Sequence, residues 1–91
     1  MSTTLRNSNL SAIGGRLRLM REAYGMAQVQ FAQMVGLTQQ SWNNYERGRR
    51  RIDLDQAFRL CAVTGVTLDW IYFGDRSGLP LRLAQMIPEE G

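Results

Sequence analysis

The basic residues of this 91-residue chain are unevenly distributed, and all of them are arginine. Seven lie between residues 12 and 51, where the only acidic residues are Glu22 and Glu46, so this stretch carries a net charge of +5. Residues 52–91 contain three arginines and six acidic residues and carry −3. Guanidinium groups gathered in one part of a chain are typical of a surface that binds a polyanion. The charge distribution therefore predicts one face for a polyanion and another for solvent or a partner.

The sequence offers little material for catalysis or metal binding. It contains no histidine, which is the commonest general base and metal ligand, and it has no phosphate-binding glycine loop. The single cysteine, Cys61, lies among apolar residues and cannot form an internal disulfide. We interpret it as a buried structural thiol, and we expect no enzymatic activity, no cofactor and no metal.

Membrane association is also not expected. No apolar run reaches the roughly 18 residues that a membrane-spanning helix needs. The first dozen residues are polar and lack the hydrophobic stretch of a signal peptide. These features predict a cytoplasmic protein.

Helical periodicity runs through most of the chain, and no run of residues alternates as a β-strand would. We expect a single all-α domain of five short helices, with a flexible arm at residues 1–10, the folded domain at 11–74 and a tail at 75–91 in which a short helix is an option. The expected helices cover residues 11–24, 28–35, 39–47, 54–64 and 68–73. Glycines follow each of them, as is common at helix ends.

Apolar stripes along these helices predict the core. The residues expected to face inward are Ile13, Leu17, Met20, Tyr24, Phe31, Ala32, Val35, Leu37, Trp42, Tyr45, Leu54, Ala57, Phe58, Cys61 and Trp70. Trp42, Tyr45 and Trp70 could in principle stack on nucleic-acid bases, but their helical spacing favours the core.

The second and third expected helices are separated only by Gly36, Leu37 and Thr38, and so short a turn predicts a steep crossing of the helix-turn-helix kind. Together with its flanks, this unit contains a series of motifs, which are Arg21, Gly25-Met26-Ala27-Gln28, Phe31-Ala32, Val35-Gly36-Leu37-Thr38-Gln39-Gln40-Ser41, Tyr45-Glu46-Arg47-Gly48 and Gly65-Val66-Thr67-Leu68-Asp69-Trp70-Ile71 with Gly74. In this order and spacing, over roughly residues 12–74, the chain resembles the lambda repressor and Cro family and the related XRE-type bacterial regulators.

The resemblance implies a phage-repressor-like DNA-binding domain in which the third helix enters the major groove of double-stranded DNA. Amide side chains can read adenine with paired hydrogen bonds, and the residues implied to read bases are Gln39, Gln40, Asn43 and Asn44. The residues implied to bind phosphates are Gln28, Ser41, Arg47, Arg49, Arg50 and Arg51. Arg21 and Glu46 are implied to form a partly buried structural ion pair that does not contact DNA.

One departure from the family pattern affects the start of the second helix. Ala27 stands where a serine or threonine cap is usual, which weakens the expected N-cap by roughly 1 kcal/mol.

These observations predict a cytoplasmic, sequence-specific transcriptional regulator, bacterial or phage-encoded, that binds an inverted-repeat operator as a homodimer. The dimer surface is expected at the fifth helix and the tail around Leu79, Leu81 and Leu83. The alternative is an antitoxin that binds a toxin protein and autoregulates its own operon. Its toxin-binding surface would come from the tail or from Leu19, Val29 and Met34, where the family usually carries polar residues.

Overall fold

A computed structural model describes residues 8–90 of the chain. These residues form helices and no strand, so the expected all-α class is confirmed. The helices are α1 (Leu10–Ala23), α2 (Gln28–Val35), α3 (Gln39–Glu46), α4 (Leu54–Thr64), α5 (Leu68–Phe73) and α6 (Leu81–Met86). Most of the arm expected at residues 1–10 lies outside the described residues.

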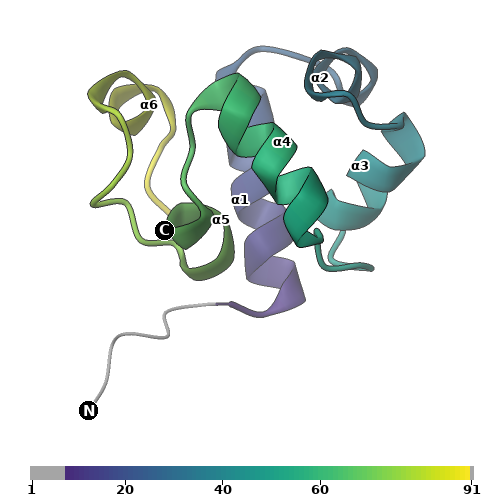
Figure 1. Ribbon diagram of the computed structural model, residues 1–91, viewed down its shortest axis with the longest axis horizontal. Helices are drawn as coiled ribbons and strands as arrows, with labels where there is room; N and C mark the ends of the chain where they lie inside the picture. The colour runs from purple at the N-terminus through teal and green to yellow at the C-terminus, as the bar shows by residue number, and fades with distance from the viewer. Residues whose placement is uncertain (1–7, 91) are drawn as a thin grey trace.

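The helices are arranged around α1, which runs through the middle of the molecule (Figure 1). At one end of the long axis α2 and α3 lie side by side, and α5 and α6 lie toward the other end, while α4 crosses in front of α1. The pair α2 and α3 is therefore at one end of the molecule, and the C-terminal segment is remote from it.

Short polar signals in the sequence set the helix boundaries around the α2–α3 turn. The Thr38 hydroxyl accepts a hydrogen bond of 3.1 Å from the Ser41 backbone nitrogen and so caps α3. Gly36 ends α2 with a φ of +79°, in the left-handed region that side chains disfavour. These local signals end α2 and begin α3 on either side of the short turn that the sequence predicted.

A single core joins all six helices. Trp42 and Tyr45 of α3 and Trp70 of α5 are all buried, which confirms that they are core residues. The Phe31 ring lies 4.9 Å from the Trp42 ring, centroid to centroid, so α2 and α3 pack through an aromatic contact. Large side chains on the inner face of α3 therefore anchor this helix in the core, and this packing fixes the position of its outer face.

The packing of α4 corrects one expectation. Leu54 and Phe58 were expected to face inward, but they are 54% and 52% exposed. The buried side of α4 is formed by Ala57, Leu60 and Thr64. Residues 54 and 58 also have helical spacing, so α4 carries two apolar stripes, and the stripe with the small Ala57 is the one that packs against the domain.

The C-terminal segment corrects a second expectation. Leu79 and Leu83 were expected at a dimer surface, but both are buried in the core of the monomer, and only Leu81 is exposed. The Arg76 guanidinium donates hydrogen bonds to the backbone carbonyls of Ala84 and Ile87, at 2.7 and 2.9 Å. Because these groups already have partners within the chain, α6 is an integral part of the fold.

Arg16 is a third correction, because it adds no charge to the outer surface of the basic stretch. Its side chain is fully buried, although its charge was counted in the net charge of residues 12–51. Its Nε donates to the Glu90 carboxylate at 3.1 Å, and its Nη1 donates to the Ile71 carbonyl, also at 3.1 Å. Burial lowers the pKa of Arg16, and the charge of Glu90 opposes that shift. Arg16 therefore fastens the end of the described chain to α1.

A close approach between α1 and the end of α3 fixes the position of α3. A Cβ atom on Gly14 would lie 2.6 Å from the Tyr45 carbonyl oxygen and closer still to that of Glu46. The neighbouring Gly15 has nothing within 4 Å of its Cβ position. Only a residue without a side chain fits at position 14, so α1 contacts the α3 backbone directly.

Candidate nucleic-acid interface

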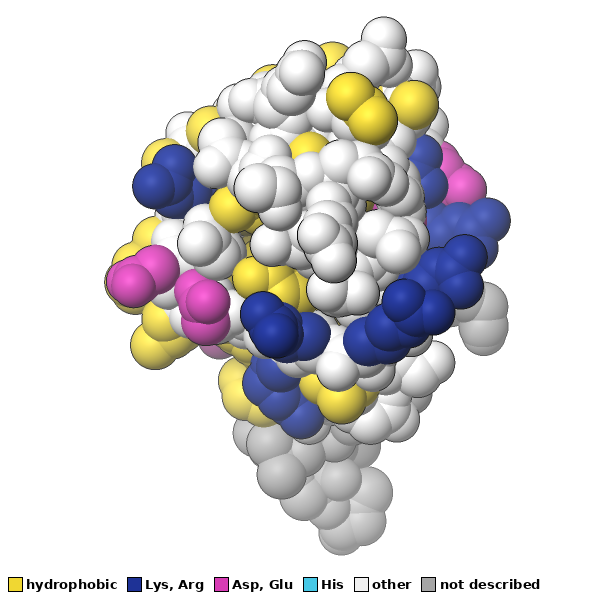
Figure 2. All heavy atoms as spheres, turned by 90° about the vertical axis from the view of Figure 1, so that its right-hand side faces the viewer, with side chains coloured by type: hydrophobic (Ala, Val, Ile, Leu, Met, Phe, Trp, Pro, Cys, Tyr) yellow, Lys and Arg dark blue, Asp and Glu magenta, His cyan; other side chains and the backbone are white. Residues whose placement is uncertain are grey.

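The outer surface of α2 and α3 is polar but largely uncharged. Figure 2 views the molecule from this end and shows a field of uncharged polar groups with arginine side chains along its lower and right-hand margins. Hydrogen-bonding groups in the middle and positive charge at the margins are the arrangement that base edges and phosphates respectively require.

The four amides expected to read bases all lie on α3, but they are not equally accessible. Gln39 and Gln40 in the first turn are exposed, whereas Asn43 and Asn44 are half-buried. No hydrogen bond among residues 8–90 engages the Gln40 side chain. The Gln39 side-chain nitrogen donates to Gln28 Oε1 at 2.8 Å. The N-terminal turn of α3 therefore holds the more accessible pair of amides.

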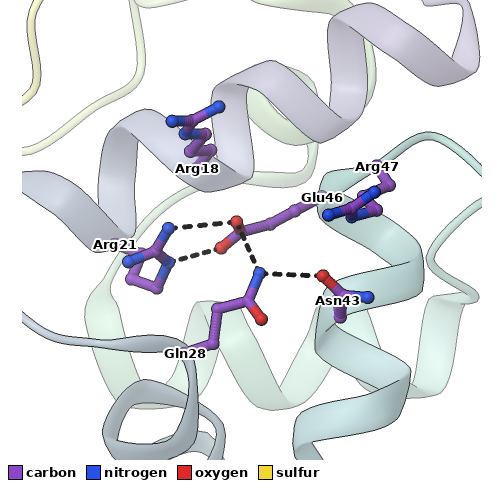
Figure 3. Close-up of a pocket in the computed structure, with 6 residues that line it drawn as sticks. All are labelled: Arg18, Arg21, Gln28, Asn43, Glu46 and Arg47. Atoms are coloured by element: carbon purple, nitrogen blue, oxygen red, sulfur yellow. Dashed lines mark hydrogen bonds and ion pairs between the residues drawn. The ribbon is translucent and has the colours of Figure 1, made fainter.

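Gln28 is the centre of an amide network that the sequence did not predict. Its Nε2 donates to Asn43 Oδ1 at 3.2 Å and to Glu46 Oε1 at 3.0 Å (Figure 3). With the Gln39 contact, this one side chain touches both the first and the last turn of α3. The phosphate contact expected of Gln28 would have to be made beside these bonds or by exchanging them.

Glu46 gathers donors from three helices. Arg21 of α1 donates to it through Nε at 2.6 Å and through Nη2 at 3.1 Å. Trp42 of α3 donates a short hydrogen bond from its indole nitrogen, one helical turn earlier, and Gln28 of α2 adds its amide. The Glu46 side chain is only 4% exposed and that of Arg21 14%. The hydrogen bond to Glu46 is the largest cause that raises the pKa of Arg21.

The arginines after α3 are well placed for an external anion. Arg47, Arg49 and Arg50 are exposed, and no hydrogen bond or ion pair within the described part of the chain engages their side chains. Arg51 is also exposed, but its Nη1 donates to the Ser8 carbonyl at 2.8 Å. Three guanidinium groups are therefore free of internal partners, and a fourth has one.

A polar pocket of about 400 Å³ lies between α1, α2 and α3 (Figure 3). It is lined by Arg18, Arg21, Gln28, Asn43, Glu46 and Arg47. Arg18 was not predicted as a site residue. It is exposed and bonded to Glu22 at 3.0 Å. Its position three residues before Arg21, on the same side of α1, was the signal that could have identified it.

Two further sequence-based expectations concern small polar groups. The Ser41 hydroxyl accepts a hydrogen bond of 2.9 Å from the Thr38 hydroxyl, so it takes part in the cap of α3. Ala27 provides no cap for α2, but the Gln30 side-chain oxygen accepts a hydrogen bond of 3.1 Å from its backbone nitrogen. One of the donors at the start of α2 is thereby satisfied despite the missing hydroxyl.

The apolar residues considered for a toxin partner are not equivalent. Val29 is 52% exposed, whereas Leu19 and Met34 are half-buried and pack against the core. On this part of the surface only Val29 offers a large exposed apolar side chain among the three.

Residues 8–90 contain neither a metal-ligand cluster nor a membrane-spanning helix. No group of three His, Cys, Asp or Glu residues there could hold a metal ion. No helix in the same range has the length and apolar character needed to cross a membrane.

Comparisons with known proteins agree on one motif. A family model described as Helix-turn-helix matches residues 17–71. A putative HTH-type transcriptional regulatory protein of Pyrococcus furiosus is 40% identical over 47 residues, which cover 52% of this chain and 15% of that protein. A SPbeta prophage-derived uncharacterized HTH-type transcriptional regulator of Bacillus subtilis is 31% identical over 68 residues, 75% of this chain and 63% of that protein. The chain thus spans less than two thirds of either relative, and no solved structure matches it.

Proposed function

The chain belongs to the helix-turn-helix family, and from that premise we propose that it binds double-stranded DNA sequence-specifically and regulates transcription. Both relatives carry names of transcriptional regulators, which supports the same class of function for this chain. We infer that α3 enters the major groove with its N-terminal turn first.

One observation carries this proposal: exposed amides on the first turn of α3 are followed, at its other end, by arginines without internal partners. Gln40 and Gln39 would read base edges, and Asn43 and Asn44 would contribute from their half-buried positions. An amide that bonds adenine through two atoms discriminates against other bases by about 1–3 kcal/mol.

The phosphate contacts would come from the margins of this surface. Arg47, Arg49, Arg50 and Arg51 would bind the backbone beyond the C-terminal end of α3, since guanidinium groups match phosphate oxygens. Gln28 would both position the amides of α3 and approach a phosphate at the start of α2. Ser41 would add a hydroxyl close to the same backbone.

A homodimer on an inverted repeat completes the proposal. One α3 helix contacts only a few base pairs, and two copies on half-sites one helical turn apart, about 34 Å, are the usual way to raise specificity. The two copies would present the same surface to the two halves of the operator.

Selection of bound duplexes from a random pool tests this function. Gln40→Ala should relax the base preference of the selected sequence, whereas Arg50→Ala should weaken binding to all duplexes alike. Gln85→Ala, which alters an exposed glutamine on α6, is the matched control and should change neither property. The proposal fails if no duplex is enriched at low salt, or if Gln40→Ala and Arg50→Ala have the same effect.

A further inference from the structure

The outer face of α4 is apolar, and nothing else in residues 8–90 covers it. Leu54 and Phe58 are 54% and 52% exposed, and residues four apart are neighbours on a helix surface. Ala62 continues the same line and is exposed as well. Large apolar side chains gathered on one face of a helix mark a surface that another macromolecule covers.

Two opposite charges border this apolar line. Asp55 and Arg59 are exposed, and no ion pair within the described residues includes either of them. At 100° per residue they lie together on the strip beside Leu54 and Phe58. An apolar line with an acid and a base one turn apart along its edge is complementary to its own copy.

A two-fold axis shows why. In such an interface residue i of one copy meets residue j of the other, and j meets i. With the axis near Phe58, the two Phe58 rings pack together, Asp55 of one copy lies opposite Arg59 of the other, and this pair occurs twice.

The position of α4 suits two copies bound to one duplex. It lies in front of α1 in Figure 1, so its outer face is at the left edge of Figure 2, where apolar, acidic and basic side chains gather beside the polar surface of α3. A two-fold axis at this edge leaves both α3 helices on the same side of the dimer. The shortest extent of the molecule is 24 Å, of the same order as the spacing of about 34 Å between half-sites.

We propose that the outer face of α4 is the surface on which a second copy of this chain docks. The inference rests on the proposed function in one respect, since that copy is the one on the neighbouring half-site. A single helix of 11 residues offers less than the roughly 800 Å² per partner of a standard interface. The free protein therefore self-associates weakly, and DNA strengthens the contact by holding two copies close together.

The first experiment compares two lysine substitutions on the same helix. Phe58→Lys removes the centre of the proposed contact, and Val63→Lys alters a residue that is 47% exposed on another side of α4. Sedimentation equilibrium of the free protein at low salt should show a dissociation constant at least about tenfold higher for Phe58→Lys, because it buries two like charges face to face. Val63→Lys should leave the constant unchanged, and thermal unfolding should show that both variants fold.

The second experiment tests the charge pair directly. Asp55→Arg and Arg59→Asp each place like charges opposite one another and should weaken self-association. The double variant restores opposite charges and should recover the affinity of the unmodified chain. Loss in both single variants without recovery in the double variant would overturn the proposed register, as would equal effects of Phe58→Lys and Val63→Lys.

Binding to duplexes with one or two selected half-sites separates this inference from the proposed function. If both hold, Phe58→Lys keeps its affinity for one half-site and loses cooperative binding to two. A chain that binds single half-sites but remains a monomer at all concentrations and on paired half-sites overturns the role of α4 and leaves the function standing. A chain that dimerises through α4 but binds no duplex overturns the proposed function and leaves the role of α4 in self-association standing.

Discussion

Replacing Arg21 with methionine should destabilise the fold strongly, because it leaves a carboxylate in the interior without its cationic partner. The Glu46 side chain is 4% exposed, and two of its hydrogen bonds come from the Arg21 guanidinium, at 2.6 and 3.1 Å. Methionine keeps much of the length of the arginine side chain, so the change removes charge and donors rather than packing volume.

The magnitude follows from burial. Removing one partner of a buried ion pair costs about 3–5 kcal/mol. In a domain of this size each kcal/mol lowers the melting temperature by roughly 4 °C or more, so we expect a decrease of at least about 12 °C. Arg18 provides the matched control, since it is paired with Glu22 on the same helix but both side chains are about half exposed or more. Arg18→Met should cost no more than about 0.5 kcal/mol.

The assay is urea unfolding followed by circular dichroism, on Arg21→Met, Glu46→Gln, the double variant and Arg18→Met. Because the double variant no longer buries an unpaired charge, it should be more stable than the sum of the single effects predicts. Equal destabilisation by Arg21→Met and Arg18→Met would refute the reasoning. Strictly additive effects of Arg21→Met and Glu46→Gln would refute it as well.

Three further predictions come from other parts of the structure. Gly14→Ala should destabilise the fold because its methyl group meets the α3 backbone, whereas Gly15→Ala should stabilise it by up to about 1 kcal/mol through helix propensity, as thermal unfolding will show. Burial raises the pKa of Cys61 and of Tyr72 above their ordinary values of 9.0 and 10.0. Stability from a raised pKa is present below the unfolded-state value and lost as pH rises through the folded-state value, so the free energy of unfolding should fall above about pH 9. If about three arginines of each subunit bind phosphates, duplex binding should follow a log–log salt slope near −5, made shallower by Arg50→Ala.

Each of these has a clear opposing result. Equal stability changes for the two glycine variants would mean that α1 can shift away from α3. An unfolding free energy that stays constant between pH 8 and the alkaline limit of folding would contradict the burial of the thiol and the phenol. A salt slope that Arg50→Ala does not change would remove that residue from the phosphate contacts.

The parts of the fold that the sequence predicted are those decided within one helix or one turn. Trp42 and Tyr45 repeat with helical spacing between a threonine cap and a glycine, so the boundaries of α3 and its buried side were both readable. The three-residue turn between α2 and α3 was likewise readable from Gly36, Leu37 and Thr38. Local chemistry alone sets these features.

The features that the sequence could not supply depend on partners far along the chain. Leu54 and Phe58 have the same spacing as the residues that α4 buries, and only the packing of α4 against the other helices decides between the two stripes. Arg16 meets Glu90, 74 residues later, and Gln28 meets Gln39 only because two helices cross. Charge counts and periodicity carry no information about such contacts, which is why the charge of the buried Arg16 was counted in the basic stretch.

The bond between Arg16 and Glu90 has a consequence for biosynthesis. A ribosome produces α1 first, and the carboxylate that neutralises its buried cation is among the last groups of the described chain to be made. A nascent chain that ends after α5 has the whole helix-turn-helix unit but neither this counter-ion nor Leu83 of α6, which is buried in the core. Folding of the domain is therefore expected to be completed only after residue 90 has left the exit tunnel.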